Sequence, residues 1–244
     1  MNDHFAEKLI RRLKCIHDLD EEDEVALRAL PLRIERQPSR HDIVIEGDRP
    51  SQCCLMFEGI SCMYKTTSAG KRQILAFYIA GDLPDLHSLH LPILDSTLRT
   101  ISPCTVGFVP HSVLRELATR RPQIASAFWR STLIDGSIFR EWVINVAARQ
   151  AYGRISHLLC EQVERLRAVG LVGDDFSCKL PLTQGDLAEA TGLSVVHVNR
   201  SLQDLRQEGL LSFDKMILKI LDWRGLKAAG EFDPTYLFLE PLKQ

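Results

Sequence analysis

The chain has 244 residues, of which 45% are hydrophobic and 25% are charged, and its formal net charge is −2. No apolar run reaches the roughly 20 residues of a membrane-spanning helix, and the charged start lacks the apolar centre of a secretory signal, so we expect no membrane partner. Seven cysteines without a CxxC pair favour the reducing cytoplasm over a disulfide framework.

Residues 1–120 begin with a short predicted helix and then become rich in β-prone runs. Glycine-containing turn signals separate these runs at intervals of about 11 residues. Such spacing predicts an antiparallel β-roll or jelly roll. The predicted strands cover residues 34–36, 42–45, 53–57, 60–66, 73–79 and 100–109.

Residues 121–149 predict one long helix that opens at Pro122, because proline suits the first helical turn. Two rows of side chains recur every seven residues along it: Ile124, Ser131, Ile138 and Asn145, and Ala127, Ile134, Glu141 and Ala148. A stripe of this length indicates a partner helix and therefore a dimer. The open alternative is a helix that packs along its own domain.

Residues 150–244 contain a predicted helix-turn-helix between Leu182 and Leu211. Thr183 and Asp186 have the spacing of a capping box, with Asp in place of the usual Glu or Gln. Gly192 suits the sharp turn between two helices, and Ser194 suits the cap of the second. The runs 210–213 and 216–221 then predict a β-hairpin, as in a winged helix. The alternative is an ordinary helical hairpin in a small domain.

The second helix of this motif, over residues 194–207, carries the predicted DNA contacts. We expect Arg200 to bind a guanine edge, Asn199 or Gln203 to bind a second base or a phosphate, and Ser194 to bind phosphate. His197 suits either role, and exposed valines suit thymine methyl groups. The predicted contact residues are Ser194, Val195, Val196, His197, Asn199, Arg200 and Gln203.

This organisation resembles the CRP/FNR family of bacterial transcription regulators over nearly the whole chain. The most specific pieces are residues 182–211, the hinge-like stretch 152–159, and the roll signatures at 45–48 and 57–59. The resemblance implies an α+β protein with a β-roll sensory domain (1–120), a dimerisation helix (121–149) and a winged helix-turn-helix (150–244). It also implies a homodimer on two-fold double-stranded DNA, with RNA polymerase as a further partner.

The sensing end departs from the best-known branches of the family. Asp85-Leu86 stands where nucleotide-binding members have Gly-Glu, and Leu94 stands where they have a phosphate-binding Arg. Cys15 stands alone before Cys53, whereas the oxygen-sensing branch has a tight cysteine cluster. We therefore expect neither cyclic AMP nor an iron–sulfur cluster, and no metal. The candidate effector residues are Asp85, His87 and Arg99. The close spacing of Asp85, His87 and His90 also leaves open a metal or haem site.

No phosphate-cradling loop, nucleophile elbow or HExxH motif occurs, so we expect no enzyme activity. A sequence-specific transcription regulator that responds to a signal in the roll is the preferred interpretation. The alternative is a ligand-binding regulatory module whose winged helix contacts another protein. These patterns do not identify the inducer, the operator, the target genes or the direction of regulation.

Overall fold

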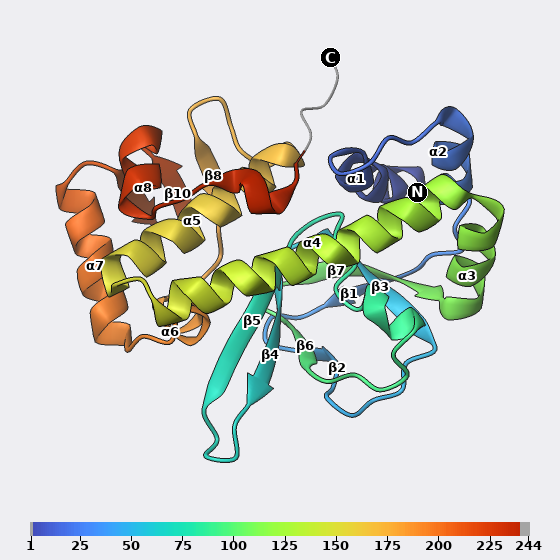
Figure 1. Cartoon of the computed structure of the whole chain (residues 1–244), viewed down its shortest axis with the longest axis horizontal. Helices are drawn as coiled ribbons and strands as arrows, with labels where there is room; N and C mark the ends of the chain where they lie inside the picture. The colour runs from blue at the N-terminus through green and yellow to red at the C-terminus, as the bar shows by residue number, and fades with distance from the viewer. Residues whose placement is uncertain (1, 240–244) are drawn as a thin grey trace. The chain divides into compact units, whose positions relative to one another are not determined.

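The computed structural model describes residues 2–239, which form two compact units (Figure 1). The first unit contains residues 2–65 and 76–136 with Leu239, and the second contains 66–75 and 137–238. The long helix α4 (Pro122–Ala147) contributes to both. Within the described residues, no helix is long and apolar enough to cross a membrane.

The first unit opens with two helices, where the sequence predicted one. Helix α1 (Asn2–Lys14) buries Leu9, Ile10 and Leu13, and α2 (Glu21–Arg28) follows after a short turn. A reciprocal capping box stops the two from merging, because Asp20 Oδ1 accepts from the Asp23 backbone N–H at 2.7 Å.

Two antiparallel sheets then form the predicted roll. One has the order β1 (Arg33–Gln37), β7 (Cys104–Pro110), β3 (Gln52–Glu58), and the other β2 (Asp42–Val44), β6 (Thr97–Thr100), β4 (Ser61–Thr66), β5 (Arg72–Tyr78). The single strand predicted over 100–109 is wrong. The segment 101–103 turns the chain from one sheet to the other, with the Ile101 N–H bonded to the Ile60 carbonyl at 2.8 Å.

The core of the roll lies between these sheets, because alternate residues of each strand point inward. It is made of Cys54, Met56, Met63, Ala76, Tyr78, Leu98, Cys104, Val106 and Phe108. All seven cysteines are buried free thiols. Burial raises the pKa of both Cys104 and Cys178 to about 11, which keeps these thiols protonated and unreactive at neutral pH.

Three helical elements complete the first unit. They are the short 3-10 helix η1 (Leu86–Leu89), the helix α3 (His111–Arg120) and the first half of α4. Arg115 of α3 fixes η1 by donating from Nη2 to the Leu89 carbonyl at 2.7 Å. These elements line a pocket of about 750 Å³.

The second unit contains the winged helix. Helix α5 (Ala151–Ala168) precedes β8 (Ser177–Lys179), α6 (Gln184–Thr191), α7 (Val195–Gln207), β9 (Leu211–Asp214) and β10 (Ile217–Ile220). Helix α8 (Trp223–Ala229) and the 3-10 helix η2 (Pro234–Leu237) follow. The α+β fold of roll, long helix and winged helix-turn-helix is as predicted. Strand β8, which pairs with β10, was not predicted.

The predicted seam of α4 is the wrong face for a dimer. Five residues of this seam are already buried within the single chain, each at most 3% exposed. They are Ile124, Ala127, Ile134, Ile138 and Asn145. The exposed apolar residues of α4 are a different set, namely Trp129, Leu133, Phe139, Val143 and Ile144. The seven-residue period therefore reflects packing within the single chain and not a contact with a second subunit.

Candidate functional sites

The helix-turn-helix is built by the local signals that the sequence carries. Thr183 and Asp186 form the predicted capping box, with the Thr183 N–H donating to Asp186 Oδ2 at 2.8 Å. Gly192 takes the left-handed conformation (φ 67°) that ends α6. Ser194 then caps α7 by accepting from the His197 backbone N–H at 3.3 Å. The turn is therefore fixed by residues within it.

One face of α7 anchors the helix in the second unit. Val198, Leu202 and Leu205 are at most 2% exposed, as predicted. Since these side chains recur at helical spacing, the rotation of α7 about its own axis is set. The opposite face must therefore point to solvent.

That exposed face carries the predicted DNA contacts. Six of the seven are exposed: Ser194, Val195, Val196, His197, Arg200 and Gln203. Val196 is 75% exposed, which is unusual for a β-branched apolar side chain. Asn199 differs, because it is half-buried and its Nδ2 donates to Gln184 Oε1 of α6 at 3.2 Å. Gln184 thus joins this surface, and its place became visible only in the fold.

The wing follows α7 directly in the sequence, and a hydrogen bond attaches it to that helix. Strands β9 and β10 pair from Leu211 to Ile220, and the turn between them places Lys215 and Met216 at positive φ. Arg206 of α7 donates from Nη2 to the Phe213 carbonyl of β9 at 2.8 Å. Lys219 pairs with Asp175 at 2.9 Å. Arg200 and Lys215, by contrast, have neither an ion pair nor a side-chain hydrogen bond among the residues that the structure describes.

The three predicted effector residues do not form one site. Asp85 is fully buried, and its Oδ1 accepts from the Cys54 backbone N–H at 2.8 Å. Burial raises the pKa of this carboxyl to about 7. Arg99 pairs with Asp42 at 3.0 Å and lies over the Tyr64 ring, which is on the β2–β6–β4 sheet. Of the three, His87 lines the pocket between η1, α3 and α4.

Metal coordination at these residues finds no support in their geometry. His90 is exposed, whereas Asp85 is enclosed and engaged with backbone. In the part of the chain that the structure describes, no group of three or more His, Cys, Asp or Glu residues is placed to hold a metal ion.

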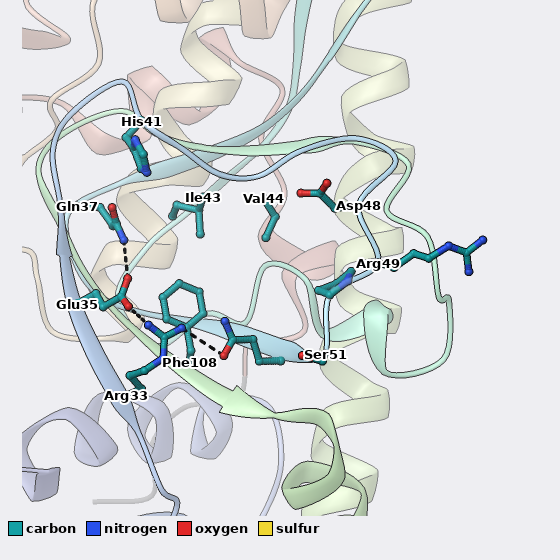
Figure 2. Close-up of a pocket in the computed structure, with 12 residues that line it drawn as sticks. Arg33, Glu35, Gln37, His41, Ile43, Val44, Asp48, Arg49, Ser51 and Phe108 are labelled. Carbon is teal, nitrogen blue, oxygen red and sulfur yellow. Dashed lines mark hydrogen bonds and ion pairs between the residues drawn. The ribbon is translucent and has the colours of Figure 1, made fainter.

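A second pocket, of about 530 Å³, opens between β1, β2 and the 48–52 segment (Figure 2). Figure 2 shows that two of its charged residues, Arg33 and Glu35, pair with each other. Arg33 pairs with Glu35, lies 4.7 Å over the Phe108 ring and donates to Gln52 Oε1 at 3.3 Å. Glu35 also accepts from Gln37 at 2.9 Å, and Arg49 points outward. This mutual pairing leaves little unbalanced charge to attract an anionic ligand.

The fold and the exposed α7 surface define a winged-helix DNA-binding protein with a sensory-type roll, and comparisons with known proteins agree. The cyclic nucleotide-binding domain model matches residues 35–121, and the Crp-like helix-turn-helix domain model matches residues 153–229. The transcriptional activator protein FnrA of Stutzerimonas stutzeri is 24% identical over 213 residues, which is 87% of this chain and 84% of that protein. The transcriptional activator protein Anr of Pseudomonas aeruginosa is 25% identical over 210 residues, 85% of this chain and 82% of that protein.

Solved structures show the same fold. FixK2 from Bradyrhizobium japonicum has a TM-score of 0.73 at 23% identity and covers 82% of this chain and 98% of its own. The c-di-GMP responsive global regulator CLP of Xanthomonas campestris has a TM-score of 0.64 at 17% identity and covers 82% of this chain and 99% of its own. This chain belongs to the CRP/FNR family and is a DNA-binding transcription regulator.

Proposed function

We propose that this protein acts in the cytoplasm as a homodimer that presents two copies of α7 to a two-fold operator. We further propose that it activates transcription by contacting RNA polymerase. The names of FnrA and Anr as transcriptional activators support the direction of regulation. The family relation supports the pairing of subunits and the two-fold symmetry of the DNA site.

One observation carries the DNA-binding part of this proposal, namely the exposed face of α7. A helix that is capped by Ser194 and anchored by Val198 and Leu202 presents its outer residues in a fixed array. Arg200 has the fork of donors that matches a guanine edge, and Val196 offers an apolar contact to a thymine methyl group. Such an array reads base edges in a major groove.

The matching surface for a second subunit is the exposed row of α4. Trp129, Leu133, Gly136, Arg140 and Val143 follow one another at alternating spacings of four and three residues, the pattern of a coiled-coil seam. Trp129, Leu133 and Val143 are 68%, 55% and 64% exposed. A second copy would remove these side chains from water.

Arg200→Ala is expected to weaken binding to the operator by about 1–3 kcal/mol per half-site and to relax the preference at one base position. The operator is first selected from random duplexes with the purified protein, and affinity is then measured by fluorescence anisotropy at fixed salt. Arg120→Ala, which removes a highly exposed arginine of α3, is the matched control and is expected to leave the affinity unchanged. Equal affinities of Arg200→Ala and the unchanged protein would contradict the proposed contact.

We also propose that neither cyclic AMP nor an iron–sulfur cluster is the signal. Leu94 is 1% exposed and offers an apolar side chain where a phosphate-binding arginine would stand. Cys15 is buried, and the sequence has no other cysteine before Cys53. Calorimetric titration with cyclic AMP is expected to give no heat of binding. Micromolar binding that also changes operator affinity would overturn this proposal.

A further inference from the structure

Three polar side chains of the second unit meet between α5 and η2. His157 and Glu161 lie one turn apart on α5 and are at most 1% exposed, and Tyr236 of η2 places its hydroxyl between them. The Tyr236 oxygen is 3.1 Å from His157 Nε2 and 2.9 Å from Glu161 Oε2. We call this group the α5–η2 triad. All three residues lie within 137–238, so the second unit builds the triad alone.

The other ring nitrogen of His157 determines which hydrogen bonds the triad can form. This atom, Nδ1, lies 3.0 Å from the Gly230 carbonyl oxygen. A carbonyl oxygen only accepts hydrogen bonds, so Nδ1 must carry a hydrogen and donate it. In a neutral imidazole the second nitrogen is then an acceptor without a hydrogen. Nε2 of a neutral His157 therefore needs a hydrogen from Tyr236.

The Tyr236 hydroxyl has one hydrogen, and two groups compete for it. Burial raises the pKa of Tyr236, so the hydroxyl keeps this hydrogen. An ionised Glu161 is an acceptor only, and a neutral His157 also presents an acceptor, at Nε2. With both groups in these forms, one of the two contacts would bring two acceptors together without a hydrogen between them. Such a contact is costly in the interior, where water does not replace the missing bond.

One additional proton satisfies every contact, and either end of the triad can carry it. With the proton on Glu161, the carboxyl group donates to the Tyr236 oxygen and the hydroxyl donates to His157. With the proton on His157, the ring donates to the Tyr236 oxygen and the hydroxyl donates to Glu161. Both arrangements hold the same number of protons, namely one more than a neutral imidazole and an ionised carboxylate.

The charged groups around the triad oppose the effect of burial. Burial penalises the charged form of each end group, and so it raises the pKa of Glu161 and lowers the pKa of His157 to about 4. Arg165, 3.8 Å from Glu161 Oε1, favours the ionised carboxylate. Glu141 of α4, 3.6 Å from His157 Nε2, favours a charged ring, whereas Arg149, which pairs with Glu141, disfavours it. With these effects opposed, the number of hydrogens that the contacts require is the deciding factor.

We propose that the α5–η2 triad holds one buried proton at neutral pH, and that loss of this proton in alkaline solution weakens the attachment of η2 to α5. Without the proton, Tyr236 donates to His157 or to Glu161 but not to both. The triad is thus a pH-sensitive contact within the DNA-binding unit. This inference goes beyond the proposed function, because it requires no operator, no ligand and no second subunit.

The expected pH dependence follows from the protons bound in the folded and unfolded states. In an unfolded chain the pKa of histidine is about 6.5 and that of glutamate about 4.3. Between these values the unfolded pair also holds one additional proton, so folding changes no proton count at the triad. Above about pH 6.5 the folded triad keeps a proton that the unfolded chain has lost. The equilibrium constant for unfolding is therefore expected to rise by up to tenfold per pH unit, until the folded triad releases its proton.

The first test is urea unfolding of the full chain from about pH 5 to about pH 9, followed by tryptophan fluorescence. Glu161→Gln retains the shape of the side chain and removes its titration, so the alkaline rise in the unfolding constant is expected to disappear. Glu164→Gln makes the same change three residues further along α5, where the side chain pairs with Arg167, and is expected to keep the rise. An equal rise in Glu161→Gln and Glu164→Gln would overturn the proposal.

The attachment of η2 is followed separately by amide hydrogen exchange. At about pH 9, residues 234–237 are expected to be less protected in the unchanged protein than in Glu161→Gln. Residues 195–207 of α7, in the same two samples, serve as the internal reference. Equal protection of η2 in both proteins would contradict the proposed loss of attachment.

A last measurement uses the unchanged protein and so does not depend on how any variant folds. Nuclear magnetic resonance of the chain labelled with ¹⁵N-histidine and ¹³C-glutamate reports the protons on the His157 ring and on the Glu161 carboxyl group. Near neutral pH we expect one additional proton in total, on the carboxyl group or on the ring. A singly protonated ring together with an ionised Glu161 would overturn the proposal.

Discussion

Val143→Glu is expected to convert the protein from a dimer into a monomer and to weaken operator binding by roughly 10³-fold, because linkage of two half-sites is lost. Val143 is 64% exposed and belongs to the same four-three row of α4 as Trp129 and Leu133. In a parallel pair of helices, residues at such positions face their own copies across the two-fold axis. A glutamate there would bring two like charges together in an apolar interface, where each also loses hydration.

Val25→Glu is a closely matched control. Val25 lies on α2 and is 65% exposed, nearly the same as Val143. The two substitutions also replace the same residue type and introduce the same charge. We expect this variant to remain a dimer with unchanged operator affinity. Sedimentation equilibrium gives the mass of each variant, and anisotropy gives the affinity. A dimeric Val143→Glu with normal operator binding would show that the subunits pair through another surface.

Glu161→Ala is expected to lower the free energy of unfolding of the second unit by about 3–5 kcal/mol, because it removes one partner from a buried charged network. Glu161 is fully buried in α5, and its Oε2 accepts from Trp142 Nε1 and from the Tyr236 hydroxyl, both at 2.9 Å. Its Oε1 accepts from Gln162 Nε2 at 3.2 Å and lies 3.8 Å from Arg165 Nη1.

These contacts explain why a single carboxylate has so large an expected effect. Burial raises the pKa of Glu161, because the ionised carboxylate loses its hydration. The surrounding donors partly offset this loss by stabilising the ionised form. Removal of the carboxylate takes away the acceptor of Trp142 Nε1 and of the Tyr236 hydroxyl, and the ion-pair partner of the buried Arg165. The same network joins α4, α5 and η2, and its loss loosens all three within the second unit.

Urea unfolding followed by tryptophan fluorescence measures the change, since Trp142 and Trp223 both lie in the second unit. Glu164→Ala removes a carboxylate from the same helix, where it pairs with the exposed Arg167, and is expected to cost less than about 1 kcal/mol. Glu161→Gln retains the shape of the side chain and is expected to fall between the two. A similar small loss for Glu161→Ala and Glu164→Ala would show that the network contributes little to stability.

The helix-turn-helix was predictable from the sequence because its determinants are local. The capping box of Thr183 and Asp186, the left-handed Gly192 and the cap at Ser194 all act within a few residues of themselves. The helical period of Val198, Leu202 and Leu205 then fixes which side of α7 is exposed. The roles of the exposed residues toward DNA remain predictions.

The face of α4 that is buried was not predictable in the same way. A seven-residue apolar period is equally suited to a partner helix and to the chain's own core, because both exclude water. The fold resolves this by burying Ile124, Ala127 and Ile134, while Trp129 and Leu133 stay exposed. Period alone cannot distinguish the two, since the choice depends on elements that are distant in the sequence.

Local signals were enough to predict the order of roll, long helix and winged helix, and the outward face of α7, because caps, turns and periodicity act over a few residues. The pairing of β8 with β10 and the hydrogen bond from Tyr236 to Glu161 follow only from the packed fold. Each of these joins segments that are separated along the chain. Their meeting depends on how the whole core packs, which no local pattern encodes.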